Sequence, residues 1–106
     1  MRGVVYCTAI KYGMEKEWKF ALSMYLNETD DFHKIDLQYG LSCSREPYLI
    51  HLYLSTQFDE TKVKFQDAMR GLTYASTSVY ANAITWNFLK ENWSKFFERF
   101  KNLKFL

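Results

Sequence analysis

Residues 85–100, TWNFLKENWSKFFERF, hold the strongest amphipathic pattern in the chain and decide its fold class. Counted from Trp86, apolar residues recur at i, i+3, i+7, i+10, i+11 and i+14, the spacing of one face of an α-helix. They are Trp86, Leu89, Trp93, Phe96, Phe97 and Phe100. The segment therefore predicts one helix over residues 86–100 with an aromatic face that packs against its neighbours.

The same helical spacing recurs in the rest of the chain. It predicts helices near residues 2–12, 14–28, 32–43, 47–58 and 65–79, so that about six helices are expected in all. The chain has only 4 glycines and 1 proline, which disfavours a fold with many tight turns. We therefore expect an all-α fold. The residues expected to pack its core are Trp18, Leu22, Tyr25, Leu49, Tyr53, Leu72, Trp86, Leu89, Trp93 and Phe97.

Large apolar residues of three expected helices, Trp18, Leu49 and Trp86, recur at intervals near the period of two-helix solenoid repeats. The expected architecture is an α/α superhelix of the HEAT or armadillo kind, in a single segment over residues 1–106. Two polar residues are expected to cap helices within it. Ser44 stands before Pro47 at one helix start, and Asp59 stands where a further helix would begin.

Composition and charge exclude several classes of protein. With 14 basic and 12 acidic residues the formal charge is +2, and 48% of residues are hydrophobic, which excludes intrinsic disorder. No stretch approaches the roughly 20 apolar residues of a membrane span, and the start of the chain makes a poor signal peptide.

Residues 90–104 are basic around an aromatic face, so binding to a membrane or a partner helix stays an alternative to simple packing. Nucleic-acid binding is disfavoured by the low net charge.

Side chains typical of catalysis or metal binding are sparse. The glycines are isolated, so no phosphate-binding loop is predicted, and His33 and His51 are too far apart to form a paired metal motif. Cys7 and Cys43 allow either one disulfide or two buried thiols. Two N-glycosylation sequons begin at Asn27 and Asn92, a number close to chance for this composition. We predict neither a catalytic residue nor a metal ligand in the chain.

Several separated motifs nevertheless resemble one family over about residues 2–100. In chain order they read VYC-x-AI from Val5, G-x-E-x-EW-x-FA from Gly13, Y-x-NET from Tyr25, CSREPYL from Cys43, YL at residues 53–54, QDA from Gln66 and W-x-F-x-x-x-NW-x-x-FF from Trp86. In this order and spacing they are similar to the C-terminal helical domain of M1 zinc aminopeptidases of the aminopeptidase N type.

The resemblance implies a HEAT-like superhelix that caps a catalytic domain and helps to enclose the peptide-substrate cavity. It also implies a disulfide between Cys7 and Cys43 and a glycan on Asn27. Ser94 stands where relatives carry a lysine, so the resemblance does not extend to a glycan on Asn92. Phe65 stands where a basic residue is usual before Gln-Asp-Ala, so the resemblance does not extend to a charge contact at that position.

The family's zinc ligands and its GAMEN substrate motif lie in a domain outside this sequence. The resemblance therefore implies that the chain is a non-catalytic piece of a larger C-terminal domain, whereas the parent enzyme is a zinc-dependent aminopeptidase. Its implied partners are the catalytic domain, the peptide substrates and, in some members, a dimer partner. Its implied location is extracellular or at the cell surface, in a secreted or membrane-anchored parent. The alternative is a stand-alone helical interaction module without enzymatic activity.

Overall fold

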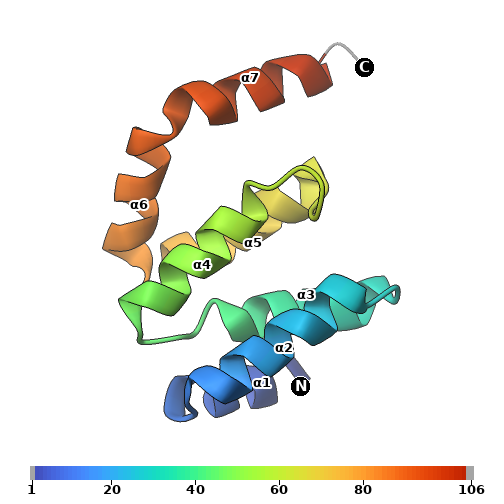
Figure 1. Ribbon diagram of the computed structural model, residues 1–106, viewed down its shortest axis with the longest axis vertical. Helices are drawn as coiled ribbons and strands as arrows, with labels where there is room; N and C mark the ends of the chain where they lie inside the picture. Colours follow the sequence, from blue (N-terminus) through green and yellow to red (C-terminus); the bar gives the residue numbers. More distant parts are fainter. Residues whose placement is uncertain (1, 105–106) are drawn as a thin grey trace.

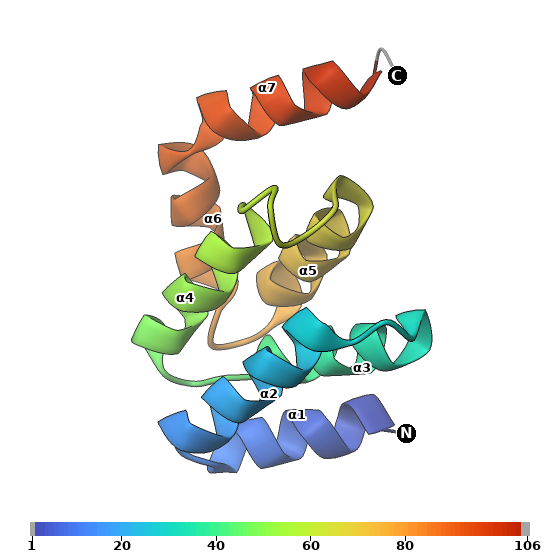
Figure 2. The ribbon, with the colours of Figure 1, turned by 45° about the vertical axis from the view of Figure 1, so that its right-hand side comes forward.

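The computed structural model describes residues 2–104, and this part of the chain contains seven α-helices and no strand. The all-α fold class is thus confirmed. The first three helices lie at one end of the long axis and the next two in the middle; the sixth runs beside these two, and the last lies across the other end (Figures 1 and 2). In chain order they are α1 (Arg2–Tyr12), α2 (Glu15–Asn27), α3 (Asp31–Leu41), α4 (Pro47–Gln57), α5 (Phe65–Thr77), α6 (Asn82–Glu91) and α7 (Trp93–Lys104).

The seventh helix arises because the helix expected over residues 86–100 is divided at Asn92. Asn92 leaves the helical region, with φ −114° and ψ 21°, and its side-chain amide donates to the Phe88 carbonyl at 2.9 Å. Asparagine competes in this way with backbone hydrogen bonding, and it often ends helices. α7 consequently leaves α6 in a new direction (Figure 1).

The core lies between α2, α3, α4 and α5, with contributions from neighbouring turns. Trp18 is 1% exposed, and its indole nitrogen donates to the Leu41 carbonyl at 3.1 Å, so this large side chain joins α2 to the end of α3. Among the residues expected to pack the core, five are buried and two are half-buried. The buried ones are Trp18, Tyr25, Leu49, Tyr53 and Leu72, and the half-buried ones are Leu22 and Leu89.

Three expected core residues lie on the surface, and for these the prediction was wrong. Trp86, Trp93 and Phe97 are 53%, 56% and 48% exposed. After the change of direction at Asn92, α7 packs against the core through Phe96 of the predicted stripe, whereas Trp93 and Phe97 of the same stripe stay exposed. A stripe counted through an unbroken helix therefore misplaced Trp93 and Phe97, whereas Trp86 lies on α6, before the division. The side chain of Phe100, at the end of that stripe, lies outside the described residues.

The two expected caps act on turns rather than on helix starts. α4 begins at Pro47 with Glu46 as its N-cap, and the Ser44 hydroxyl accepts a hydrogen bond from the Glu46 amide at 3.1 Å. Asp59 likewise accepts from the Thr61 amide at 2.9 Å, within a turn that precedes α5. A proline favours the first helical position, which moves the start of α4 beyond the reach of Ser44 as an N-cap.

Between residues 2 and 104 no helix combines the length and the apolar character that crossing a bilayer requires.

Candidate functional site

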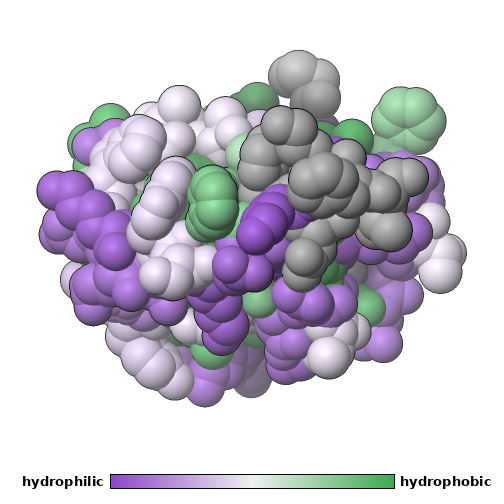
Figure 3. All heavy atoms as spheres, turned by 90° about the horizontal axis from the view of Figure 1, so that it is seen from above, coloured by the Kyte–Doolittle hydropathy of each residue, from purple (hydrophilic) through white to green (hydrophobic). Residues whose placement is uncertain are grey.

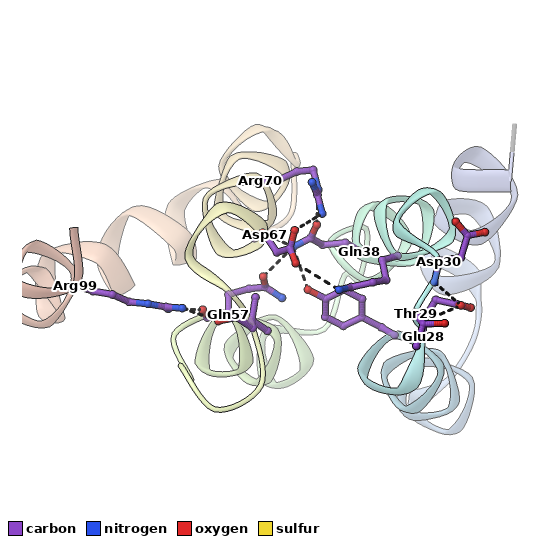
Figure 4. Close-up of polar contacts among 11 residues, drawn as sticks. Glu28, Thr29, Asp30, Gln38, Gln57, Asp67, Arg70 and Arg99 are labelled. Carbon is purple, nitrogen blue, oxygen red and sulfur yellow. Dashed lines mark hydrogen bonds and ion pairs between the residues drawn. The ribbon is translucent and has the colours of Figure 1, made fainter. Parts of the chain in front are cut away.

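The most organised polar cluster is buried between α2, α3, α4 and α5, and Gln38 lies at its centre (Figure 4). The Gln38 side-chain amide nitrogen donates to Gln57 Oε1 at 2.9 Å, to the Tyr25 hydroxyl at 3.3 Å and to the Asp67 carbonyl at 2.6 Å. Its oxygen accepts from Arg70 Nε at 2.8 Å, and the Arg70 guanidinium also binds the Asp67 carboxylate at 2.9 Å. The side chains of Gln38 and Gln57 are fully buried, and these bonds offset the cost of removing the Gln38 amide and Gln57 Oε1 from water. Gln57 Nε2 is buried without a hydrogen-bond partner among the described residues.

Two phenols complete this cluster without adding acid or base chemistry. The Tyr53 hydroxyl donates to the Gln38 carbonyl at 3.3 Å and to the Gly71 carbonyl at 3.0 Å. Burial raises the pKa of Tyr53 well above its ordinary value, and burial is also the main cause that raises the pKa of Tyr25. Both phenols therefore stay neutral near pH 7. The cluster holds α2, α3, α4 and α5 in fixed positions relative to one another.

A second group of hydrogen-bonded polar side chains lies at the N-terminal end of the molecule. His33 Nδ1 lies 2.5 Å from Glu28 Oε2, and His33 Nε2 lies 2.8 Å from the Tyr6 hydroxyl, so the imidazole joins α1 to the turn before α3. Hydrogen bonds from the Asp30 amide and from His33 hold the pKa of Glu28 below its ordinary value. No described residue adds a third metal-ligating group here, and within residues 2–104 no three His, Cys, Asp or Glu side chains gather to hold a metal ion. The described residues therefore do not fit a zinc site.

Cys7 and Cys43 are joined in a disulfide, with their Cα atoms 5.3 Å apart. The bond connects the middle of α1 to the segment that follows α3. The two helices approach closely beside it, because a Cβ on Gly40 would lie only 2.6 Å from the Cβ of Tyr6. The bond and the glycine together hold α1 against α3.

The two sequons differ in their surroundings. Asn27 is exposed at the end of α2, and the backbone at Glu28 is extended, with φ −79° and ψ 139°. Asn92 is half-buried between two helices, and Ser94 of the same sequon is already part of α7. His51, the second histidine, is exposed on α4 and lies apart from His33.

An apolar hollow with a volume of about 500 Å³ opens between α1 and α2. It lacks the convergent polar groups that orient a small-molecule substrate. Lys16 and Glu17 are its only charged lining residues, and its apolar walls include Ile10, Phe20 and Met24. The polar cluster around Gln38 thus lies in the core, and the hollow between α1 and α2 is apolar.

This arrangement agrees with the comparison of the sequence with known families. Residues 1–106 match the family described as the ERAP1-like C-terminal domain. The chain belongs to this family. The resemblance that the separated motifs predicted is therefore confirmed along the whole chain.

Relatives of the chain are aminopeptidases of much greater length. Aminopeptidase N of Oryctolagus cuniculus is 34% identical over 100 residues, which cover 94% of this chain and 10% of that protein. Aminopeptidase N of Homo sapiens is 33% identical over 97 residues, with 92% and 10% coverage. Aminopeptidase Q of Felis catus is 32% identical over 100 residues, with 94% and 10% coverage. The chain spans about a tenth of the length of these relatives.

Helical periodicity did not predict the polar cluster around Gln38. A signal was present, because Gln38 and Gln57 are amides placed among the apolar residues of two predicted helices. Their common location depends on contacts between positions 19 residues apart, which helical periodicity does not reveal.

Proposed function

We propose that the chain is a non-catalytic helical segment of an M1 zinc aminopeptidase, and that it packs against the catalytic domain and helps to enclose the peptide-substrate cavity. The observation that carries the proposal is the family match over residues 1–106 together with relatives named aminopeptidase N. Zinc and the catalytic residues then belong to other parts of the parent protein. The segment shapes the cavity and takes no part in bond cleavage.

Two surface features support packing against further protein. Large apolar side chains are exposed near both ends of the helical stack, with Phe20 68% exposed on α2 and Trp93 56% exposed on α7. Exposed apolar side chains in clusters are typical of interaction sites, and terminal units of helical stacks expose apolar edges when neighbours are absent. The same surfaces provide room for a dimer partner in the assembled enzyme.

The proposal extends to the cellular compartment and to covalent modification. A disulfide persists in oxidising compartments, so the pairing of Cys7 with Cys43 supports a secreted or cell-surface parent. The exposed sequon at Asn27 provides a glycosylation site in that compartment. These proposals stand or fall together, because each needs the secretory pathway.

The first experiment is to determine the complete transcript that encodes this chain and to assay the protein it encodes. We expect an open reading frame that continues into an HExxH zinc motif and a GAMEN-like motif. The complete protein should hydrolyse aminoacyl p-nitroanilides and lose this activity to a zinc chelator, whereas residues 1–106 alone should be inactive. A stop codon directly before Met1 would overturn the proposal and favour a stand-alone interaction module.

Enclosure of the cavity needs its own test. Hydrogen exchange of the chain can be compared between the isolated segment and its complex with the zinc domain. We expect added protection around Phe20 or Trp93 in the complex, and a peptide substrate should alter the exchange of cavity-facing amides further. If the zinc domain leaves exchange unchanged throughout the segment, the chain does not pack against it.

A further inference from the structure

The disulfide lies in the wall of an open hollow. Cys7 and Cys43 both line a hollow of about 200 Å³ between α1, the end of α3, the end of α5 and the turn after α5. No described residue of α7 lines it, and the α7 end of the molecule presents separate apolar groups among hydrophilic residues (Figure 3). Cys7 is half-buried, whereas Cys43 is only 9% exposed. Solutes can therefore approach the bond through this hollow, and Cys7 is the more accessible of its two cysteines.

Lys11 supplies a positive charge to this hollow. It follows Cys7 by four residues on α1, so the two side chains share one face of the helix. The Lys11 ammonium lies 5.6 Å from the centroid of the Tyr80 ring, which also lines the hollow, and 5.7 Å from that of Tyr12. Among the described residues, no carboxylate forms an ion pair with Lys11. A cation is thus held beside the disulfide without an acidic partner, where it can bind an anion.

Two hydroxyl groups in the walls of the hollow act as hydrogen-bond acceptors. The Ser42 hydroxyl donates its proton to the Tyr39 carbonyl at 2.6 Å. The Thr77 hydroxyl donates to carbonyls of its own helix, at 3.1 Å from Thr73 and 3.0 Å from Tyr74. A hydroxyl whose proton is engaged still accepts on its oxygen lone pairs. One cation beside such acceptors suits a small molecule that carries carboxylates together with amide or ammonium groups.

From this geometry we infer that Cys7 is a site of thiol exchange with small anionic peptide thiols. The thiolate sulfur of the incoming molecule forms a bond to Cys7 Sγ, and the bond between Cys7 and Cys43 breaks. Its electron pair leaves with Cys43 Sγ, which takes a proton from water, and Cys7 then carries a mixed disulfide. Lys11 binds a carboxylate of the thiol and so raises the local concentration of the thiol beside the bond. The inference rests on the disulfide and its hollow and is independent of the proposed aminopeptidase role.

Initial rates of exchange test the inference in the full chain with its disulfide formed and without denaturant. The two probes are reduced glutathione and its diethyl ester, which have the same thiol and differ only in whether the carboxylates are free or blocked. Each rate is divided by the rate of the same probe with hydroxyethyl disulfide, which corrects for intrinsic thiol reactivity. Acid stops the exchange, and peptide mass spectrometry then identifies the cysteine that carries the mixed disulfide.

Glutathione should react faster than its diethyl ester after this correction, by about threefold, the effect of one partly exposed ion pair. Its rate should rise in proportion to its concentration, and the mixed disulfide should form on Cys7. Lys11→Gln should remove most of the preference for glutathione, and sodium chloride at about 1 M should do the same by screening. Lys90→Gln removes a charge from an exposed site on α6 that does not line the hollow and should leave the preference unchanged.

Each other outcome would overturn the inference. Equal corrected rates for the two probes would mean that the hollow does not select anionic thiols. A rate that is independent of thiol concentration would mean that the disulfide reacts only after the domain has unfolded. A mixed disulfide on Cys43 alone would assign the attack to the other sulfur. A preference that survives Lys11→Gln, or that Lys90→Gln reduces equally, would assign the effect to the overall charge of the chain.

Discussion

Removal of the disulfide changes the free energy of unfolding by an amount that follows directly from the structure. The bond joins residues separated by 36 positions, so it closes a long loop in the unfolded chain. The loop-entropy relation gives about 3.8 kcal/mol of stabilisation for a loop of this length at 25 °C. Cys7→Ala with Cys43→Ala should therefore lower the free energy of unfolding by about 4 kcal/mol, out of the 5–15 kcal/mol typical of a domain.

Urea unfolding followed by far-ultraviolet circular dichroism provides the assay. The urea concentration at the midpoint should fall. The free energy of unfolding should depend more steeply on urea concentration, because an unfolded chain without the cross-link exposes more surface. For a chain of 106 residues, a loss of this size corresponds to a fall in Tm of roughly 17 °C. Folded-state contacts between α1 and α3 should persist in the variant, since Gly40 still permits their close approach.

Chemical reduction of the unaltered protein is the matched control. If the effect arises from loop closure, reduction and the double substitution should lower the free energy of unfolding by equal amounts within about 1 kcal/mol. A loss below about 1 kcal/mol in both experiments would refute the loop-entropy reasoning and show that α1 stays near α3 in the unfolded ensemble. A large loss on substitution with a small loss on reduction would instead assign the effect to packing of the alanines.

Three other perturbations test separate parts of the structure. Gly40→Ala should lower Tm, because the added Cβ would lie 2.6 Å from the Tyr6 Cβ. Gly3→Ala should change Tm little, since the nearest atom to its added Cβ is a carboxylate oxygen of Asp36 at 3.3 Å. Equal falls in Tm for the two variants would contradict the close approach of α1 and α3 at Gly40. The lowered pKa of Glu28 means that its stabilising contribution is present above the ordinary glutamate pKa and is lost as pH falls through the lowered value. Glu28→Gln should therefore flatten the fall in urea midpoint as the pH falls below the ordinary glutamate pKa of about 4.3, and parallel profiles would rule this out. Asn27→Gln should abolish an endoglycosidase-sensitive mobility shift after secretion from eukaryotic cells, and Asn92→Gln should leave it unchanged; a shift that depends on Asn92 would mean that its half-buried amide becomes accessible before α7 folds.

Helical periodicity predicted most of the fold because it is a local property. The stripe that begins at Met14 predicted α2 within one residue at each end, and Pro47 marked the first residue of α4. Burial of Trp18 and Tyr53 follows from the same stripes, because each lies on the apolar face of a helix enclosed by others. A single sequence suffices for such features, since neighbours along a helix repeat at fixed intervals.

Periodicity failed at the C-terminal end, where the fold depends on one residue. The apolar spacing from Trp86 to Phe97 continues through Asn92 without interruption, so nothing in the pattern marks a break. Asparagine is only mildly unfavourable inside a helix, and the gain from turning Phe96 and Arg99 towards α4 and α5 exceeds that cost. The exposed positions of Trp93 and Phe97 follow from this competition between local preference and distant contacts.

The polar contacts were beyond prediction for a related reason. Arg99 reaches carbonyls 42 and 36 residues earlier in the chain, and Gln38 receives a bond from Arg70 at a separation of 32. Such pairs become neighbours only after the helices have stacked, so no spacing rule joins them. The buried Gln38 cluster joins α2, α3, α4 and α5 from within, whereas Arg99 contacts the end of α4 and the turn after it. Substitutions at Gln38 should therefore lower the free energy of global unfolding.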